Sequence, residues 1–233
     1  MFDTHTGSSQ VSAPARVFLA RHGETTWNVE RRFQGQQDSP LTERGKEQAR
    51  RLGQRLAAEP VAAVYSSDLG RTLRTAEQVA LPHALSVRPH PGLREIDTGA
   101  WTGLGRTEVR ALPEWSASMD VYRNRPWEHC MPEGEAVAEV QARALEALRE
   151  IAPKHAGQTI AVISHHLVVE TIIAYALGQS LEELWLPYRG GNCFVSTLEI
   201  TVDNCRALSV YDGSHVADLV GLDGTKGERR DGA

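Results

Sequence analysis

One short segment constrains the fold of this chain more than any other: an apolar run at residues 17–20 that ends abruptly in Arg-His-Gly. The run has the length of a buried strand, and the polar residues 24–28 can start a helix. Arg21 and His22 would then lie at the carboxyl end of a strand, where ligands bind in open α/β sheets. Gly23 suits a sharp turn with a positive φ, so we expect the turn to present the His22 imidazole rather than bury it.

The rest of the chain alternates between strand-like and helix-like patterns. Apolar runs predict strands at 61–66, 85–87, 159–163, 193–200 and 207–211, the last two as an antiparallel pair. Helical spacing predicts helices that are capped by Thr42 and by Ser67-Asp68, a helix that opens at Gly134, and a buried helix at 167–177. This alternation predicts an α/β fold, a three-layer α/β/α sandwich around a mostly parallel sheet.

The length of 233 residues and the 41% of apolar residues allow one full hydrophobic core, and we expect one domain at residues 16–212. Residues 1–15 are predicted to be a disordered lead and residues 213–233 a flexible tail. Residues 101–132, with few β-branched side chains after 113, are predicted to form an irregular, partly helical insertion over the site.

Charge and cysteine content argue against several function classes. A net charge of −5 and a pI near 6.0 give no general attraction to nucleic acid or to acidic membranes, so we expect neither partner. No apolar run approaches membrane-spanning length, and the first fifteen residues do not resemble a secretory signal. The three cysteines show no Cys-x-x-Cys spacing, which argues against a disulfide scaffold or zinc cluster and favours the cytoplasm.

Three separated segments place an ionisable residue just after a predicted strand or at the next helix start: Arg21-His22, Arg71 and His165. If the strands are parallel, these side chains converge at one edge of the sheet. Two guanidinium groups and two imidazoles around one point would bind an anion such as phosphate. The backbone N–H of His166, at a helix start, could add a further donor.

Residues 21–28 and 32–45 resemble the histidine phosphatase superfamily, specifically its phosphoglycerate mutase-like branch, and the resemblance covers about residues 16–212. It implies the same three-layer fold. It also implies that His22 is the nucleophile that takes a phosphoryl group from the substrate. Arg71, in the Ser-Asp-Leu-x-Arg-Thr pattern of residues 67–72, matches the second phosphate-binding arginine of the family, and His165 matches its second histidine.

The same resemblance assigns further roles. The segment 93–99 looks like the loop that carries the family's acid, so Glu95 would protonate the leaving group and then act as base on water. Pocket positions fall on Asn28 for the phosphate and on Gln34, Gly35 and Arg94 for the rest of the substrate. His166 stands where the family usually has glycine, and it would crowd the phosphate pocket or add charge to it. No metal or other cofactor is implied, because the cations of the chain itself supply the charge.

Other functions stay open at this point. A phosphoglycerate mutase would return the phosphoryl group to another substrate oxygen, but residues 34–42 look more like those of phosphatase members. A metallohydrolase would use His22, His165, His166 and Glu95 as ligands, without a supporting His-x-x-x-His pattern. A non-catalytic domain that only binds a phosphorylated ligand is the third alternative.

The substrate class depends on the insertion, whose cations could face a second anionic group or could pair with carboxylates at the surface. They are Arg106, Arg110, Arg123, Arg125 and His129. If they cover the pocket, we expect a small phosphorylated metabolite that carries another carboxylate or a cluster of sugar hydroxyls. The sequence leaves the oligomeric state open, a homodimer being one option.

Overall fold

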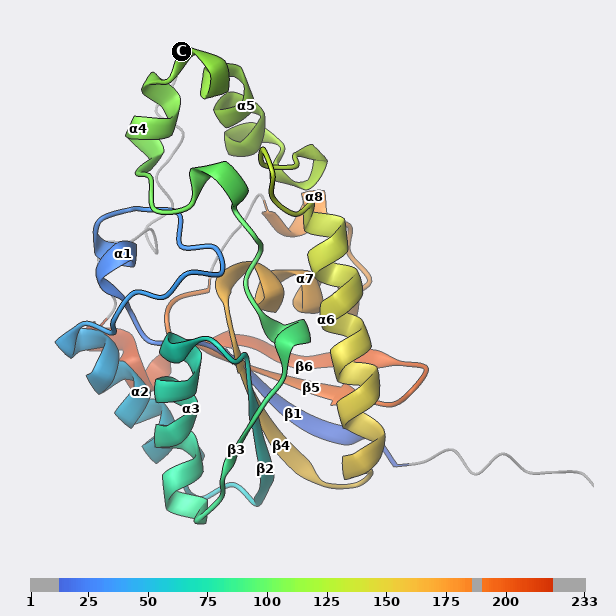
Figure 1. Ribbon diagram of the computed structural model, residues 1–233. Coiled ribbons are helices and arrows are strands. Elements are labelled where there is room, and N and C mark those ends of the chain that lie inside the picture. The colour runs from blue at the N-terminus through green and yellow to red at the C-terminus, as the bar shows by residue number, and fades with distance from the viewer. Residues whose placement is uncertain (1–12, 186–189, 220–233) are drawn as a thin grey trace, which may run out of the picture.

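The computed structural model of this protein describes residues 13–185 and 190–219. Its central feature is a six-stranded sheet in the order β3-β2-β4-β1-β5-β6, covered by helices on both faces (Figure 1). The strands are β1 (Ala15–Arg21), β2 (Val61–Ser66), β3 (Val87–Pro89), β4 (Thr159–Ser164), β5 (Val195–Ile200) and β6 (Cys205–Asp212). The first four run parallel, whereas β5 is antiparallel to β1 and β6 to β5. The predicted three-layer sandwich with a mostly parallel sheet is confirmed.

Two hydrophobic clusters form because successive side chains of a strand point to opposite faces of the sheet. Val17 and Leu19 of β1 belong to the cluster under α6 (Val137–Ile151) and α7 (His166–Leu177). Phe18 and Ala20 belong to the cluster under α2 (Glu43–Leu56) and α3 (Gly70–Ala80). All four side chains are at most 1% exposed, so β1 is held from both sides.

Most predicted helices are present, with small changes at their ends. Thr42 caps α2 as expected, because its side chain accepts a hydrogen bond from Gly45 N. The α6 helix buries the predicted apolar stripe but begins at Val137 rather than at Gly134. The shorter helices are α1 (Thr26–Val29), α4 (Arg106–Ala111), α5 (Pro113–Asn124) and α8 (Leu181–Trp185), and the 3-10 helices are Leu81–His83, Pro91–Leu93, Gly99–Trp101, Pro126–Glu128, Ala152–His155 and Ser214–Leu219.

The cap of α3 differs from the prediction. Its N-cap position is Leu69, which offers no side-chain acceptor, and neither Ser67 nor Asp68 caps the helix. The acceptor comes instead from Asp38, whose carboxylate receives Gly70 N at 2.5 Å and Arg71 N at 3.2 Å. A distant loop therefore supplies the cap, and α3 begins only where that loop packs against it.

The insertion is more helical than predicted, since α4 and α5 occupy most of it. We call residues 99–132 the roof segment, because α4 and α5 lie beyond the carboxyl ends of the parallel strands (Figure 1). Its inner side is an aromatic cluster. The Trp101 ring lies 5.3 Å from both Phe33 and His129, and the Tyr122 ring lies 5.4 Å from Phe33.

The ordered part of the chain is longer at both ends than predicted. β1 begins at Ala15, inside the expected lead, and residues 1–12 lie outside the described residues. The tail was expected to be flexible from residue 213, yet Ser214–Leu219 forms a 3-10 helix in which Val216 is fully buried. Residues 220–233 again lie outside the described residues. No helix in the described ranges is long and apolar enough to cross a membrane.

Candidate active site

The loop of residues 21–24 leaves the carboxyl end of β1, and hydrogen bonds from four other parts of the fold hold its backbone. The partners lie on β4, on the loop at 192–193 and on helices α3 and α2. His22 N donates to Ser164 O, Cys193 N to Arg21 O, Asn192 Nδ2 to His22 O, Gly23 N to Thr75 Oγ1, and Glu24 N to Gln48 Oε1, at 2.9–3.1 Å. The backbone of this loop is therefore fixed before any ligand arrives.

Gly23 is required for a reason other than the predicted one. It does not take a positive φ. A Cβ at Gly23 would instead overlap the carbonyl oxygen of Gly45, at the start of α2, and a Cβ at Gly45 would overlap the carbonyl oxygen of Glu24. The close approach of two backbone segments also encloses His22, which is 2% exposed, so the expectation of an exposed imidazole is wrong.

The His22 ring is held in one tautomer. Its Nδ1 lies 2.7 Å from the carbonyl oxygen of Gly23, and because a carbonyl only accepts, Nδ1 carries the proton of the neutral ring. The Nε2 lone pair remains for chemistry. Burial, followed by the charges of Arg71 and Arg21, lowers the pKa of His22 well below its ordinary value. The imidazole is therefore neutral and nucleophilic at neutral pH.

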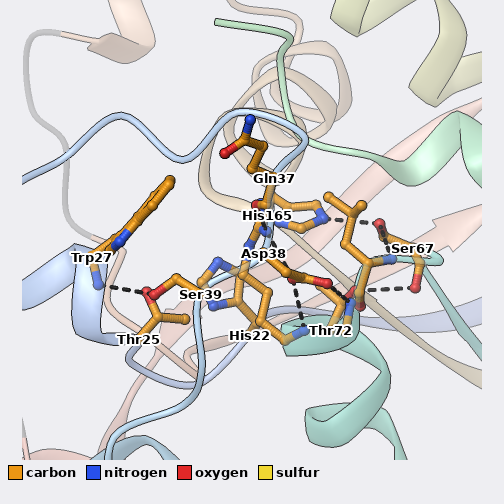
Figure 2. A network of polar contacts seen from close by, with 12 residues as sticks. His22, Thr25, Trp27, Gln37, Asp38, Ser39, Ser67, Thr72 and His165 are labelled. Atoms are coloured by element: carbon orange, nitrogen blue, oxygen red, sulfur yellow. Dashed lines mark hydrogen bonds and ion pairs between the residues drawn. The ribbon is translucent and has the colours of Figure 1, made fainter. Parts of the chain in front are cut away.

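His165 lies beside His22, with 5.3 Å between the ring centroids. Figure 2 shows the two rings and the hydrogen bond between His165 and Ser67, where Nε2 and Oγ are 2.9 Å apart. Its Nδ1 is buried and has no hydrogen-bond partner among the described residues. Burial, with the charges of Arg71 and His22, also lowers the pKa of His165, so a second neutral ring faces the site.

Arg71 brings a guanidinium into the site that is only 2% exposed. Its Nη1 donates to Gln37 O at 2.6 Å and to Asp38 Oδ1 at 3.1 Å, and its Nη2 donates to Gly35 O at 2.8 Å. The Nε atoms of Arg71 and of Arg21 are both buried without a partner in the part of the chain that the structure describes. Two N–H donors on two cations thus remain for an anion.

Glu95 is half-buried at the same edge. Its Oε1 accepts a hydrogen bond from Ile96 N at 3.0 Å. Burial raises the pKa of Glu95, although the Ile96 N–H and the cations Arg71 and Arg21 act in the opposite direction. A carboxyl group that holds its proton at higher pH than usual can serve as a general acid.

His166 and the roof segment approach this edge from the other side. Burial, followed by the charges of Arg21 and Arg106, lowers the pKa of His166. Burial raises the pKa of Tyr122, on which the charges of Arg106 and Glu95 also act. The charge of the exposed residue Arg106, in the roof segment, therefore acts on both His166 and Tyr122.

The remaining predicted residues have mainly structural partners. Asn28 Oδ1 accepts hydrogen bonds from the backbone N and the side chain of Thr25, the N-cap of α1, and so completes a capping box. Gly35, with φ of +50°, contributes its carbonyl to Arg71. Arg94 forms a two-point pair with Asp68 at 2.5 and 2.7 Å and thereby holds its own loop. Gln34 is 9% exposed, and its Oε1 is buried without a partner among the described residues.

Several residues that build the site were not identified from the sequence: Asp38, Gln48, Ser67, Thr75 and Asn192. Their hydrogen-bond partners lie far away in the sequence. The separation is 33 residues between Asp38 and Arg71, 98 between Ser67 and His165, and 170 between Asn192 and His22. No local pattern marks such contacts, although Asp38 and Ser67 lie inside segments quoted above for other reasons. Within the described ranges, no three His, Cys, Asp or Glu side chains come together so that they could hold a metal ion.

Comparison with known proteins matches residues 17–213 to the histidine phosphatase superfamily (branch 1). The "Probable phosphoglycerate mutase GpmB" of Cronobacter sakazakii is 37% identical over 189 residues, which cover 79% of this chain and 84% of that protein. Phosphoserine phosphatase 1 of Hydrogenobacter thermophilus is 34% identical over 170 residues, 73% of this chain and 80% of that protein. The solved structure of Bacillus stearothermophilus YhfR superposes with a TM-score of 0.82 at 38% identity and covers 87% of this chain and 99% of its own.

The cap of α3 can be tested by stability measurements. Asp38→Ala removes the acceptor of Gly70 N and a partner of the buried Arg71, so we expect the free energy of unfolding in urea to fall by about 1–3 kcal/mol. Asp68→Ala is the matched control, because it removes the acceptor predicted from sequence and breaks only a partly exposed pair with Arg94. Asp68→Ala should lower the free energy of unfolding by less than about 1 kcal/mol. A larger loss for Asp68→Ala than for Asp38→Ala would contradict this assignment.

Proposed function

This chain belongs to the histidine phosphatase superfamily (branch 1), and from that membership and the site we propose that it hydrolyses phosphomonoesters through a phosphohistidine on His22. The observation that carries the proposal is the state of the His22 ring. Its Nδ1 proton is held by Gly23 O, its Nε2 is free, and burial beside two arginines keeps it neutral.

In the first step, His22 Nε2 attacks phosphorus. The N–P bond forms as the bond from phosphorus to the ester oxygen breaks. N–H donors on Arg21, Arg71 and His165 would carry the charge on the equatorial phosphate oxygens. Donors of this kind, already in place before the reaction, are each worth about 10²–10³ in rate. Glu95 gives its proton to the leaving oxygen, a role that its raised pKa supports.

In the second step, water attacks the phosphohistidine. The Glu95 carboxylate, now without its proton, accepts one from the water as the P–O bond forms and the N–P bond breaks. Inorganic phosphate leaves, and His22 returns to its neutral state with Nδ1 still bonded to Gly23 O. Each residue ends the cycle in its starting protonation state, so no metal or other cofactor enters the scheme.

The second candidate function is a phosphoglycerate mutase, in which a substrate oxygen rather than water accepts the phosphoryl group. The name of the Cronobacter relative favours it. The name of the Hydrogenobacter relative and the phosphatase-like segment at residues 34–42 favour hydrolysis, which we retain.

We further propose a small phosphorylated metabolite with a second anionic group as the substrate. The relevant cation is Arg106, whose charge acts on both His166 and Tyr122. Arg110 pairs with Asp120 at 3.4 Å, and Arg125 pairs with Glu128 at 2.8 Å, so these two arginines serve the surface of the roof segment.

His22→Ala should abolish turnover of every phosphomonoester. In the wild type, rapid mixing with a labelled substrate followed by denaturation should trap an acid-labile phosphoenzyme on His22. Label on Ser, Asp or Cys would refute the assignment. Repeating the assay with 3-phosphoglycerate and a bisphosphoglycerate primer separates the two functions, because isomerisation faster than phosphate release would establish the mutase.

Glu95→Gln should lower kcat/KM, which reports formation of the phosphohistidine and not its hydrolysis, by about 10²–10⁴ for alkyl phosphates and far less for aryl phosphates, because only a poor leaving group needs the proton in that step. Since activity requires protonated Glu95, its raised pKa extends the activity of the wild type to higher pH, and the variant should lose that alkaline limb. The kcat/KM values for alkyl and nitrophenyl phosphates, measured across pH, test both points. Equal losses for the two leaving groups would remove Glu95 from this role.

Arg106→Gln should raise KM for phosphorylated carboxylates by about tenfold, the scale of a lost charge-assisted hydrogen bond, and leave phenyl phosphate within about twofold. Arg125→Gln is the control, because its exposed pair with Glu128 belongs to the same segment. Profiling phosphoglycerates, phosphoserine, sugar phosphates, nucleotides and phosphopeptides completes the test. Selectivity that Arg106→Gln leaves unchanged, or a phosphopeptide as the best substrate, would refute this substrate class.

A further inference from the structure

The short loop of residues 192–193 connects the backbone at His22 to the C-terminal segment 214–219. Asn192 Nδ2 donates to His22 O at 2.9 Å, and Cys193 N donates to Arg21 O at 3.1 Å. Cys193 adopts a φ of +61°, a left-handed conformation that is strained for a residue with a Cβ. Such a conformation persists only where neighbouring groups hold it, so the support of the active-site backbone depends on what holds Cys193.

The partner that holds Cys193 on its other side is His215. Its Nε2 lies 3.0 Å from the carbonyl oxygen of Cys193, and since the carbonyl accepts, Nε2 carries the proton. The Cys193 peptide groups are thus bonded on both sides, to Arg21 through N–H and to His215 through C=O. Burial lowers the pKa of His215, against the effects of the Cys193 bond and of Asp212, while Arg55 and Arg51 lower it further. The ring is therefore neutral at neutral pH.

His215 is itself fixed, because the 3-10 helix Ser214–Leu219 is anchored on α2. Val216 is fully buried in the cluster under α2 and α3. Gln48 Nε2 donates to Leu219 O at 3.1 Å, while Gln48 Oε1 accepts Glu24 N from the active-site loop. Arg51 pairs with Asp218 in an exposed contact. The segment 214–219 therefore supports residues 21–24 from two directions.

We propose that His215 is a positioning residue for His22, acting through Cys193 and Asn192. Without its hydrogen bond, Cys193 relaxes from the left-handed conformation and withdraws the donors from Arg21 O and His22 O. The His22 ring, whose orientation depends on the backbone at Gly23 O, then samples orientations in which Nε2 does not face the phosphate. The effect on turnover rests on the proposed function, but the effect on the loop does not.

The test compares three variants in the full chain. His215→Ala removes the donor, and His215→Gln offers an amide N–H at similar reach without a titrating ring. Asp218→Ala is the matched control, since it breaks an exposed ion pair of the same segment without touching residues 192–193. Two readouts are taken for each: amide hydrogen exchange at residues 22–24 by NMR, and kcat and KM for nitrophenyl phosphate.

We expect His215→Ala to speed exchange at residues 22–24 by about five- to tenfold, the scale of one hydrogen bond, and to lower kcat with KM nearly constant. His215→Gln should restore both readouts, and Asp218→Ala should stay within about twofold of the wild type. Unchanged exchange in His215→Ala, or an equal change in Asp218→Ala, would overturn the proposal. If the wild type hydrolyses no phosphomonoester, the proposed function fails while the exchange readout still decides the role of His215.

Discussion

Burial of the Arg71 guanidinium is the interaction on which the geometry of the candidate active site depends. A charged group without exposure to water is stabilised only if most of its donors are paired. Gly35 O, Gln37 O and Asp38 provide that pairing, so the loop of residues 35–38 has to lie across the start of α3. Asp38 also caps α3. One cation thus determines where a helix begins, where a loop crosses it, and which N–H remains for a ligand.

Two neutral imidazoles beside two guanidinium groups form an unusual charge arrangement. Each arginine raises the free energy of a protonated histidine next to it, and burial adds to this effect. The site therefore concentrates its positive charge on groups that do not titrate and keeps His22 and His165 uncharged. The same burial raises the pKa of the Glu95 carboxyl group, because burial disfavours its charged form. Burial thus lowers the pKa of an imidazole and raises the pKa of a carboxyl group in the same site.

Apolar periodicity and strand ends are local signals, and from them the sequence predicted the sheet, the helices that cover it and the edge shared by His22, Arg71 and His165. Glu95 was expected at that edge only from the family resemblance. The sequence did not predict what holds these residues. Asp38, Ser67 and Asn192 act across long sequence separations, where only tertiary packing determines the partner. The same limit explains two differences from the structure. The composition of Ser67-Asp68 indicates a cap, although Asp38 caps α3. The segment 213–219 is too short to show a periodic pattern, although Val216 and Leu219 pack against the cluster under α2 and α3.

The roof segment packs the rings of Trp101 and Tyr122 against Phe33 and also exchanges backbone hydrogen bonds with Phe33, whereas the contacts described for residues 21–24 are individual hydrogen bonds. Packed rings tolerate exchange for side chains of similar volume, but a lost donor has no substitute nearby. The roof segment therefore tolerates more substitutions than residues 21–24 do. Over evolutionary time, descendants of such a chain can accept substitutions on the exposed faces of α4 and α5, while the hydrogen bonds that hold residues 21–24 are inherited unchanged.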